Sequence, residues 1–140
     1  MSPELTTSLR DPNRLAALHR LDLLGSPQEE AFDRLARLTA RMLRAPIALI
    51  SLLDADRQFI KSGYGLPDAW AAQHYVPIEL SLCQSMVALH APLAIADIHA
   101  LPQQENNPGL QTFGYVAYAG APLIVDRQYV VGSLCVLDTV

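Results

Sequence analysis

The sequence predicts an α+β fold in which helices pack on the faces of a central antiparallel sheet of five or six strands. Helix signals dominate residues 11–44, and apolar runs of strand length follow from Ile47 to the end of the chain, with one further helix among them. Segments that do not alternate strictly between helix and strand favour this class over a doubly wound parallel sheet. A chain of 140 residues is expected to form one domain, which buries about two thirds of its unfolded surface.

The first helix is predicted to begin at Asp11, which acts as N-cap before Pro12 in the first helical position. Gly25 is expected to close it, because glycine readily adopts the left-handed conformation found at many helix ends. An apolar stripe between these limits consists of Leu15, Leu18 and Leu21 or Leu24.

The second helix is predicted to open at Ser26-Pro27-Gln28-Glu29, where Ser26 and Glu29 have the spacing of a capping box. One face of this helix is expected to be buried through Phe32, Leu35, Thr39, Met42 and Leu43. The opposite face is expected to be solvated, and it carries Arg34, Arg37, Arg41 and Arg44.

Strand-length runs account for most of the remaining chain. Ile47–Leu53 is nearly continuous apolar sequence, as is typical of a strand covered on both faces. The other predicted elements are a strand over Gln58–Tyr64, a helix over Ser81–His90, a strand over Pro92–Ile98 and a final antiparallel hairpin. This hairpin joins the run from Tyr118 to the run Val130–Asp138 through a polar turn at Asp126-Arg127-Gln128.

Composition excludes several classes of function. The formal net charge is −4 and Lys61 is the only lysine, so the basic footprint of a nucleic-acid-binding protein is missing. No apolar run approaches the ~20 residues that span a bilayer, and the first residues do not have the pattern of a secretory signal. We therefore expect a cytoplasmic protein without nucleic-acid or membrane partners. Cys83 and Cys135 form no CxxC pair, and we expect both to be reduced and buried.

Five segments together resemble a GAF domain, the small-molecule sensing module of many signalling proteins. The final hairpin, YAGAPL at Tyr118–Leu123 and VVGSLCVLD at Val130–Asp138, resembles the last two strands of that family. The others, in the family's order, are Leu21–Leu43, Pro46–Asp54, Ser81–Val87 and Pro92–Ile98. The resemblance extends from Asp11 to the end of the chain, so residues 1–10 are expected to form an unstructured lead before a single GAF domain over 11–140. It also implies a helix after Val140 and a place as the first module of a longer signalling protein.

The resemblance places a ligand pocket between one face of the sheet and the helices and loops that follow the second strand. The matching positions are Ser51, Leu53, Leu82, Cys83, Asp97, His99, Phe113, Tyr115 and Tyr118. Asp97 has a second interpretation, because an aspartate at the end of a strand commonly caps the following loop. Tyr115 and Tyr118 are expected on opposite faces, since alternation along a strand separates them.

Specific ligands of the family can be compared with these residues. Covalent bilin attachment needs a Cys followed by His, and here Cys83 is followed by Gln84, so covalent bilin is not expected. The Asn-Lys-Phe-Asp-Glu type of motif of cyclic-nucleotide-binding members is also missing. No metal is expected, because His74, His90 and His99 do not have ligand spacing. The ligand itself stays unassigned.

The sequence therefore favours a regulatory, ligand-sensing domain, with no enzymatic activity, that is coupled to an output such as a histidine kinase or a diguanylate cyclase. Its expected partners are an unknown small molecule and a second copy of the chain, paired through the N-terminal helices. A first alternative is a dimerisation scaffold with a vestigial pocket, in which these helices pair two copies through Leu15 and Leu18. A second, less favoured alternative is a free methionine sulfoxide reductase with Cys83 as nucleophile. That activity requires Cys135 within about 7 Å of Cys83 between Cα atoms.

Overall fold

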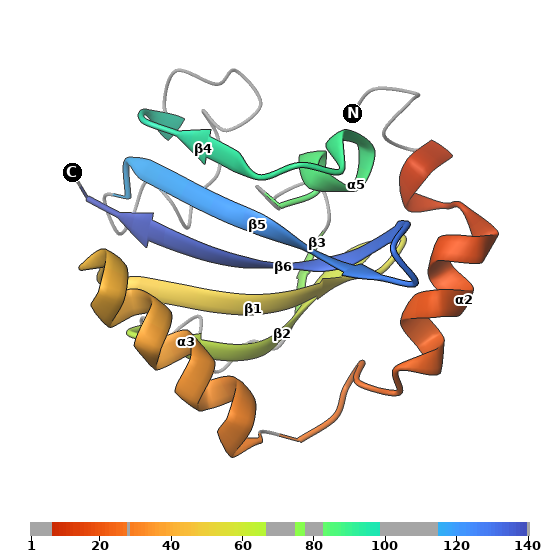
Figure 1. Cartoon of the computed structure of the whole chain (residues 1–140), viewed down its shortest axis with the longest axis horizontal. Helices are drawn as coiled ribbons and strands as arrows, with labels where there is room; N and C mark the ends of the chain where they lie inside the picture. Colours follow the sequence, from red (N-terminus) through yellow and green to blue (C-terminus); the bar gives the residue numbers. More distant parts are fainter. Residues whose placement is uncertain (1–6, 28, 67–74, 78–82, 99–114, 140) are drawn as a thin grey trace.

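The computed structural model describes residues 7–27, 29–66, 75–77, 83–98 and 115–139. These residues contain one six-stranded antiparallel sheet in the order β3-β2-β1-β6-β5-β4 (Figure 1). The strands are β1 (Ile47–Leu53), β2 (Arg57–Tyr64), β3 (Tyr75–Pro77), β4 (Leu93–Ile95), β5 (Ala117–Val125) and β6 (Tyr129–Asp138). The helices are α2 (Pro12–Arg20), α3 (Glu30–Leu43) and α5 (Ser85–Leu89). The predicted α+β class is confirmed.

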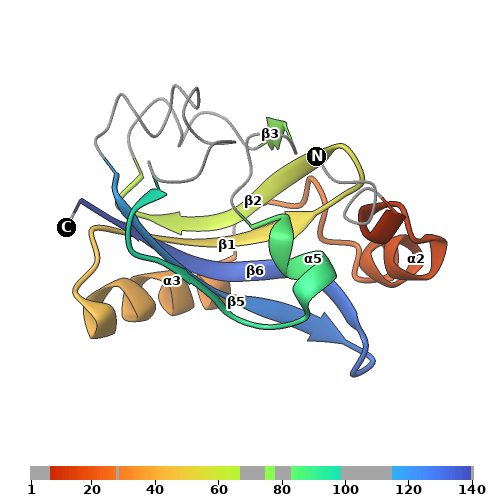
Figure 2. The same cartoon turned by 90° about the horizontal axis from the view of Figure 1, so that it is seen from above.

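Two layers of helix enclose the centre of the sheet, where β1 and β6 pair along their length. Figure 2 shows α3 lying along one side of the sheet, and α5 contributes Met86 and Val87 to the core on the other side. Every residue of β1 is buried, as predicted for a strand covered on both faces. The predicted hairpin is also confirmed, and its turn has positive φ at Asp126 and Arg127, the conformation that suits the twist of a two-stranded ribbon.

Helix α2 packs against one end of the sheet (Figure 1). Asp11 caps it as predicted, and its carboxylate accepts a hydrogen bond from the Asn13 amide over 2.9 Å. The predicted end is wrong: the helix stops at Arg20, and Gly25 adopts its left-handed φ of +70° further along the chain. Leu18 is buried in the domain's own core, and the partly buried Leu15 packs beside it.

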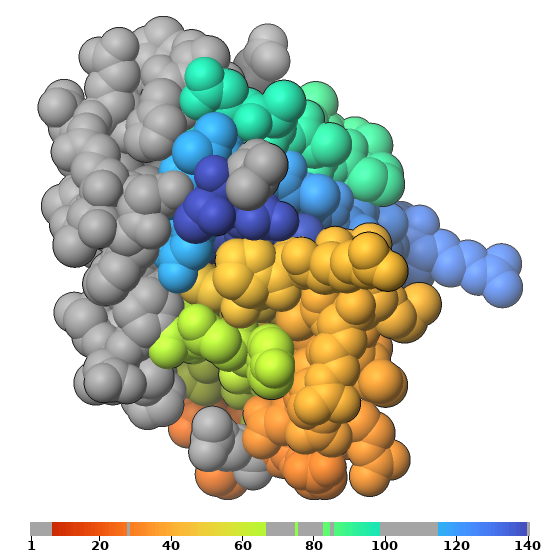
Figure 3. All heavy atoms as spheres, turned by 90° about the vertical axis from the view of Figure 1, so that its left-hand side faces the viewer, coloured from red at the N-terminus to blue at the C-terminus, as the bar shows by residue number. Residues whose placement is uncertain are grey.

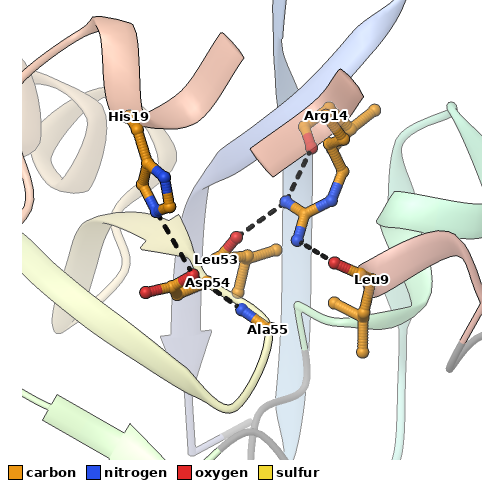
Figure 4. Close-up of polar contacts among 7 residues, drawn as sticks. Leu9, Arg14, His19, Leu53, Asp54 and Ala55 are labelled. Carbon is orange, nitrogen blue, oxygen red and sulfur yellow. Dashed lines mark hydrogen bonds and ion pairs between the residues drawn. The ribbon is translucent and has the colours of Figure 1, made fainter. Parts of the chain in front are cut away.

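Arg14 anchors α2 to the sheet from a buried position. Its guanidinium donates hydrogen bonds to three backbone carbonyls, those of Leu9 at 2.6 Å, Leu53 at 2.7 Å and Val130 at 3.2 Å (Figure 4). Burial lowers the pKa of Arg14, and the negative charges of Asp54 and Asp11 partly offset this lowering. One side chain thus connects α2, the end of β1 and the start of β6. Leu9 is itself buried in the core, so this residue of the lead predicted over 1–10 packs on the domain; residues 1–6 lie outside the described part of the chain.

The predicted capping box before α3 does not form. Glu29 occupies the N-cap position and makes no side-chain capping bond. The Ser26 hydroxyl instead donates to the Leu23 carbonyl and accepts from the buried Lys61 ammonium, which also contacts the Glu29 carboxylate at 2.6 Å. Lys61 therefore holds the segment before α3 against β2 and competes for the groups that a capping box would use.

The buried face of α3 also differs from the prediction. Ala36 and Ala40 are its buried residues, and they pack on Ala48, Ile50 and Val136 of the sheet. Phe32 is partly buried as expected, whereas the exposed fractions are 45% for Leu35, 46% for Leu38, 81% for Met42 and 60% for Leu43. Two alanines one turn apart let the helix approach the sheet closely, so the larger residues point outward. The predicted arginine face is exposed at Arg34, Arg41 and Arg44.

Candidate functional site

The face of the sheet opposite α3 carries the largest buried cluster of the domain. Leu49, Leu53, Cys135 and Leu137 belong to it, and residues at alternate positions of a strand share a face. Ser51 therefore lies on this face between Leu49 and Leu53, and Ser133 lies two residues before Cys135. We call it the Ser133 face, defined by Ser51, Ser133, Cys135 and Tyr118.

Two serines lie side by side at the centre of this face. Ser51 on β1 and Ser133 on β6 are cross-strand partners, and both are completely buried. The Gln58 side-chain amide donates a hydrogen bond to the Ser51 hydroxyl over 2.7 Å. The Ser133 hydroxyl, in contrast, has no oxygen or nitrogen partner among the described residues, and its side-chain contact is with the Cys135 thiol, whose pKa it lowers. Most buried polar side-chain atoms in proteins have a partner, and a thiol is a weak one, so Ser133 Oγ keeps hydrogen-bonding capacity inside the molecule.

A pair of thiols lies beside the serines. The Sγ atoms of Cys83 and Cys135 are 3.7 Å apart, and the Tyr118 hydroxyl donates a hydrogen bond to Cys83 Sγ over 3.0 Å. Burial is the main cause that raises the pKa of Tyr118, so its hydroxyl keeps the proton that it donates. The contact with Cys83, followed by burial, raises the pKa of the Cys135 thiol. Both cysteines are free and buried, as the sequence predicts.

Gly120 makes room for this arrangement. A Cβ atom at this position would lie 2.6 Å from the Tyr118 hydroxyl and 2.9 Å from Cε of Met86. Gly120 is also the cross-strand partner of Cys135. The glycine of the YAGAPL segment thus allows the tyrosine to reach over its own strand toward Cys83.

The structure brings together five of the residues predicted for the site. Ser51 lies on the Ser133 face, and the buried cluster contains Leu53, Cys83, Tyr115 and Tyr118. Asp97 is exposed after the short strand β4 and lies outside this cluster. Leu82, His99 and Phe113 lie outside the described residues.

The prediction that Tyr115 and Tyr118 occupy opposite faces is wrong. Both belong to the same buried cluster. The reason is that β5 begins only at Ala117, so Tyr115 precedes the strand and does not follow its alternation. The predicted helix and strand on either side of His90 are similarly shorter than expected, because α5 covers Ser85–Leu89 and β4 covers Leu93–Ile95.

Sequence reasoning missed Gln58, Gly120 and Ser133. Gln58 and Ser133 could have been found from the sequence, because Gln58 alternates with the apolar Ile60 and Ser133 with Cys135. A polar residue at an inward position of a strand needs a partner, and that conflict is the signal for both. Gly120 gives no such signal in the sequence, since the approach of Tyr118 and Met86 to it depends on tertiary packing.

Two further properties of the described residues concern metal binding and membrane crossing. No group of three or more His, Cys, Asp or Glu residues among them is placed to hold a metal ion. In the same part of the chain, none of the helices has the length and apolar character needed to cross a membrane.

The sequence and the fold together assign the family. The family model of the GAF domain matches residues 27–140, so the chain belongs to the GAF domain family, whose members are sensor modules of signalling proteins. The chain is 32% identical over 127 residues to a cyclic di-GMP phosphodiesterase of Pseudomonas aeruginosa, a match that covers 90% of this chain and 21% of that protein. The chain therefore spans about a fifth of that relative's length.

Solved structures share the fold at low sequence identity. The GAF domain of a phosphoenolpyruvate-protein phosphotransferase from Coxiella burnetii is 16% identical with a TM-score of 0.66, covering 99% of this chain and 80% of that one. An NreA protein from Staphylococcus aureus, mutated in its nitrate binding site, is 16% identical with a TM-score of 0.60, covering 77% of this chain and 83% of that one. At these identities the likeness establishes the fold alone.

Proposed function

We propose that this domain is a regulatory module that binds a small molecule on the Ser133 face and passes the binding event to an output domain. The observation that carries the proposal is the buried Ser133 hydroxyl, which has no oxygen or nitrogen partner among the described residues and only the weakly bonding Cys135 thiol beside it. Leaving such a group unpaired costs about 1–3 kcal/mol, and a ligand with a donor or acceptor would remove that cost. The neighbouring Ser51 and Gln58 already form a hydrogen bond and provide a second polar contact.

The ligand class follows from the chemistry of these groups. Ser51, Gln58 and Ser133 are uncharged hydrogen-bonding side chains surrounded by apolar residues. Side chains of this kind would recognise a ligand by hydrogen bonds and shape rather than by charge pairing. The named functions of similar proteins supply probes: cyclic di-GMP from the phosphodiesterase and nitrate from the NreA protein. Cyclic GMP, free amino acids and methionine sulfoxide complete the panel.

Coupling to the output requires that the ligand bind one conformation of the domain better than another. The Ser133 face includes Ser133 and Cys135 of β6, and β6 is also joined to α2 through Arg14, so a shift of β6 would reach α2. We infer an output of the signalling type, a kinase, a cyclase or a phosphodiesterase. We also infer a cytoplasmic location, because two free thiols 3.7 Å apart suit a reducing compartment.

Thermal unfolding against this panel tests the proposal. A compound at about a hundred times its dissociation constant adds about 2.7 kcal/mol of stability, which raises Tm on the order of 10 °C for a domain of this size. In Ser133→Ala we expect the unliganded stability to stay the same or to rise by up to about 1 kcal/mol, because an unpaired buried hydroxyl is removed. The Tm shift caused by the compound should be largely lost in this variant.

Ser62→Ala is the matched control for that experiment. The Ser62 hydroxyl is buried and donates to the Asp33 carboxylate of α3 over 2.6 Å, on the side of the sheet away from the Ser133 face. This variant should be destabilised by about 1 kcal/mol and should keep the full shift with the compound. If no compound of the panel raises Tm, or if Ser133→Ala keeps the shift unchanged, the proposed binding face is wrong.

Self-association is a second candidate function, favoured by the outer surface of α3. Figure 3 shows this helix at the surface of the molecule. Its exposed apolar residues Ala31, Leu35, Leu38 and Met42, which we call the outer row of α3, are spaced by four, three and four residues. This spacing is typical of a seam between two helices. We propose that a second copy of the chain covers the outer row.

The charges of α3 favour an antiparallel pair. Its first turn is acidic, with Glu30 and Asp33, and its last turn contains Arg41. A two-fold axis across the middle of the helix would place Leu35 beside Leu38 of the partner subunit, and it would bring the acidic first turn of each helix near the last turn of the other. A parallel pair would place like charges side by side. The pair would use α3, not the stripe of α2 in which Leu18 is buried in the domain's own core and Leu15 is partly buried beside it.

Sedimentation equilibrium measures this association. We expect the native chain to form dimers, and Leu38→Lys and Arg41→Glu each to weaken them. The double variant Glu30→Arg/Arg41→Glu should recover the dimer, because the charges are exchanged in both chains. Leu89→Lys, at an exposed leucine of α5 outside the outer row, should dimerise normally. A native chain that stays monomeric at the highest concentration reached would contradict the association.

A further inference from the structure

The thiol pair on the Ser133 face is positioned for a chemical reaction that ligand binding does not use. Cys83 lies in the turn immediately before α5, and Cys135 lies on β6, so the pair joins two elements that are 52 residues apart in sequence. Their Sγ atoms are in contact at 3.7 Å. A disulfide bond is about 2.05 Å long, so bond formation requires the two sulfur atoms to approach by only about 1.7 Å.

We propose that Cys83 and Cys135 form a two-thiol site that is converted into an intramolecular disulfide by a two-electron oxidant of the hydroperoxide class. The domain would thereby have a redox input in addition to its ligand. The proposal does not depend on the identity of that ligand, because it rests on the sulfur–sulfur contact and on the tyrosine that faces it.

The reaction balances with hydrogen peroxide as the oxidant. The Cys83 sulfur, deprotonated, attacks one peroxide oxygen, the O–O bond breaks, and Cys83 becomes a sulfenic acid while the other oxygen leaves as water. The Cys135 sulfur then attacks Cys83 Sγ, the S–O bond breaks, and a second water leaves. Two thiols and one peroxide thus give one disulfide and two waters, with both sulfurs oxidised and both peroxide oxygens reduced.

Tyr118 assigns the first step to Cys83. Its hydroxyl donates a hydrogen bond to Cys83 Sγ over 3.0 Å, and a donor of this kind stabilises the thiolate that reacts with peroxide. Cys135 is then the resolving thiol, because the Tyr118 hydroxyl donates to Cys83 and the two sulfurs are in contact. Tyr118 is a positioning residue in this scheme, since it acts on the sulfur without itself being oxidised.

The disulfide would alter the candidate ligand site directly. Ser133 lies two residues before Cys135 on the same face of β6, and the buried Gln84 follows Cys83. A covalent link would fix the turn before α5 to the strand that carries Ser133. We therefore expect the oxidised and reduced forms to differ in their response to the compounds of the panel.

Thiol counting under denaturing conditions tests the proposal on the native chain. The reduced protein should titrate two thiols, and after treatment with hydrogen peroxide none. Mass spectrometry of the unreduced digest should then show the Cys83 and Cys135 peptides joined, and dithiothreitol should restore both thiols. Oxidised chains should stay at their original molar mass, since the link is within one chain. Two thiols remaining after peroxide treatment, or links between chains only, would overturn the proposal.

Three further measurements separate the roles of Cys83, Cys135 and Tyr118. In Cys135→Ser the sulfenic acid at Cys83 should persist and react with dimedone. Tyr118→Phe should lose its thiols several-fold more slowly at the same peroxide concentration, because the hydrogen-bond donor to Cys83 Sγ is removed. Phenylarsine oxide, which requires two adjacent thiols, should bind the folded native chain at one per molecule.

Discussion

Replacement of Arg14 by methionine is expected to lower the free energy of unfolding by about 3–5 kcal/mol, the scale found when a buried charged network loses one partner. The guanidinium provides hydrogen bonds to the carbonyls of Leu9, Leu53 and Val130, and methionine provides none. Three buried carbonyl groups would then lose a donor at the junction of α2 and the sheet. Because domains of this kind have a total stability of about 5–15 kcal/mol, a large fraction of the native stability depends on this residue. Urea unfolding of the two proteins measures it.

Arg20→Met is the matched control. Arg20 lies at the end of the same helix, and its exposed side chain pairs with Asp126 at 2.9 Å. An exposed ion pair contributes about 0–1 kcal/mol, so this variant should unfold within that range of the native protein. If Arg14→Met were no more destabilised than Arg20→Met, the anchoring role of Arg14 would be wrong.

Gly132→Ala is expected to destabilise the domain by about 3 kcal/mol, at the upper end of the usual cost of overpacking. A Cβ atom at Gly132 would collide with the backbone carbonyl oxygen of Ser51 on β1. Backbone in a central strand cannot move aside without breaking the β1–β6 hydrogen bonds, so the pairing that aligns Ser51 with Ser133 should be strained as well. Denaturant unfolding and amide hydrogen exchange of β1 and β6 should both report the change.

Gly63→Ala shows whether the loss is specific to this contact. Gly63 lies on β2, and an added Cβ would first meet Cδ1 of Leu66, the end of a flexible side chain. That side chain can rotate away, so we expect a loss below about 1 kcal/mol. Equal losses in the two variants would mean that glycine substitution in this sheet acts through chain entropy rather than through the β1 contact.

Much of the sheet could be predicted from the sequence because its signals are local. Ile47–Leu53 is apolar at nearly every position, and the polar turn between two apolar runs specified the β5–β6 hairpin. The same was true of the Asp11 cap, which depends only on residues next to it in the chain.

The orientation of α3 could not be predicted, because it depends on contacts with the sheet. Periodicity placed Leu35, Met42 and Leu43 in the core, yet the helix packs through Ala36 and Ala40. Small residues permit the closer approach, and a leucine that then faces outward has the same spacing as one that faces inward. The capping box predicted at the start of α3 was wrong for a related reason, since the Ser26 hydroxyl accepts a hydrogen bond from Lys61 of β2.

The candidate site was predictable only in part. The resemblance to GAF domains led to Ser51, Cys83 and Tyr118, which the structure places in or beside one buried cluster. It did not lead to Ser133, although a serine at an inward position of an apolar strand is a signal that the sequence offers. The distance between Cys83 and Cys135 was likewise inaccessible, since it is set by how the turn before α5 packs on β6.

The central claim is that the Ser133 face binds a small molecule, and amide chemical-shift mapping tests it most directly. The compound of the panel that raises Tm is titrated into isotope-labelled native protein and into Ser133→Ala. We expect the largest shifts at the amides of Ser51, Ser133 and Cys135 in the native protein, and their loss in the variant. Shifts confined to α2 or α3, or equal shifts in both proteins, would contradict the account.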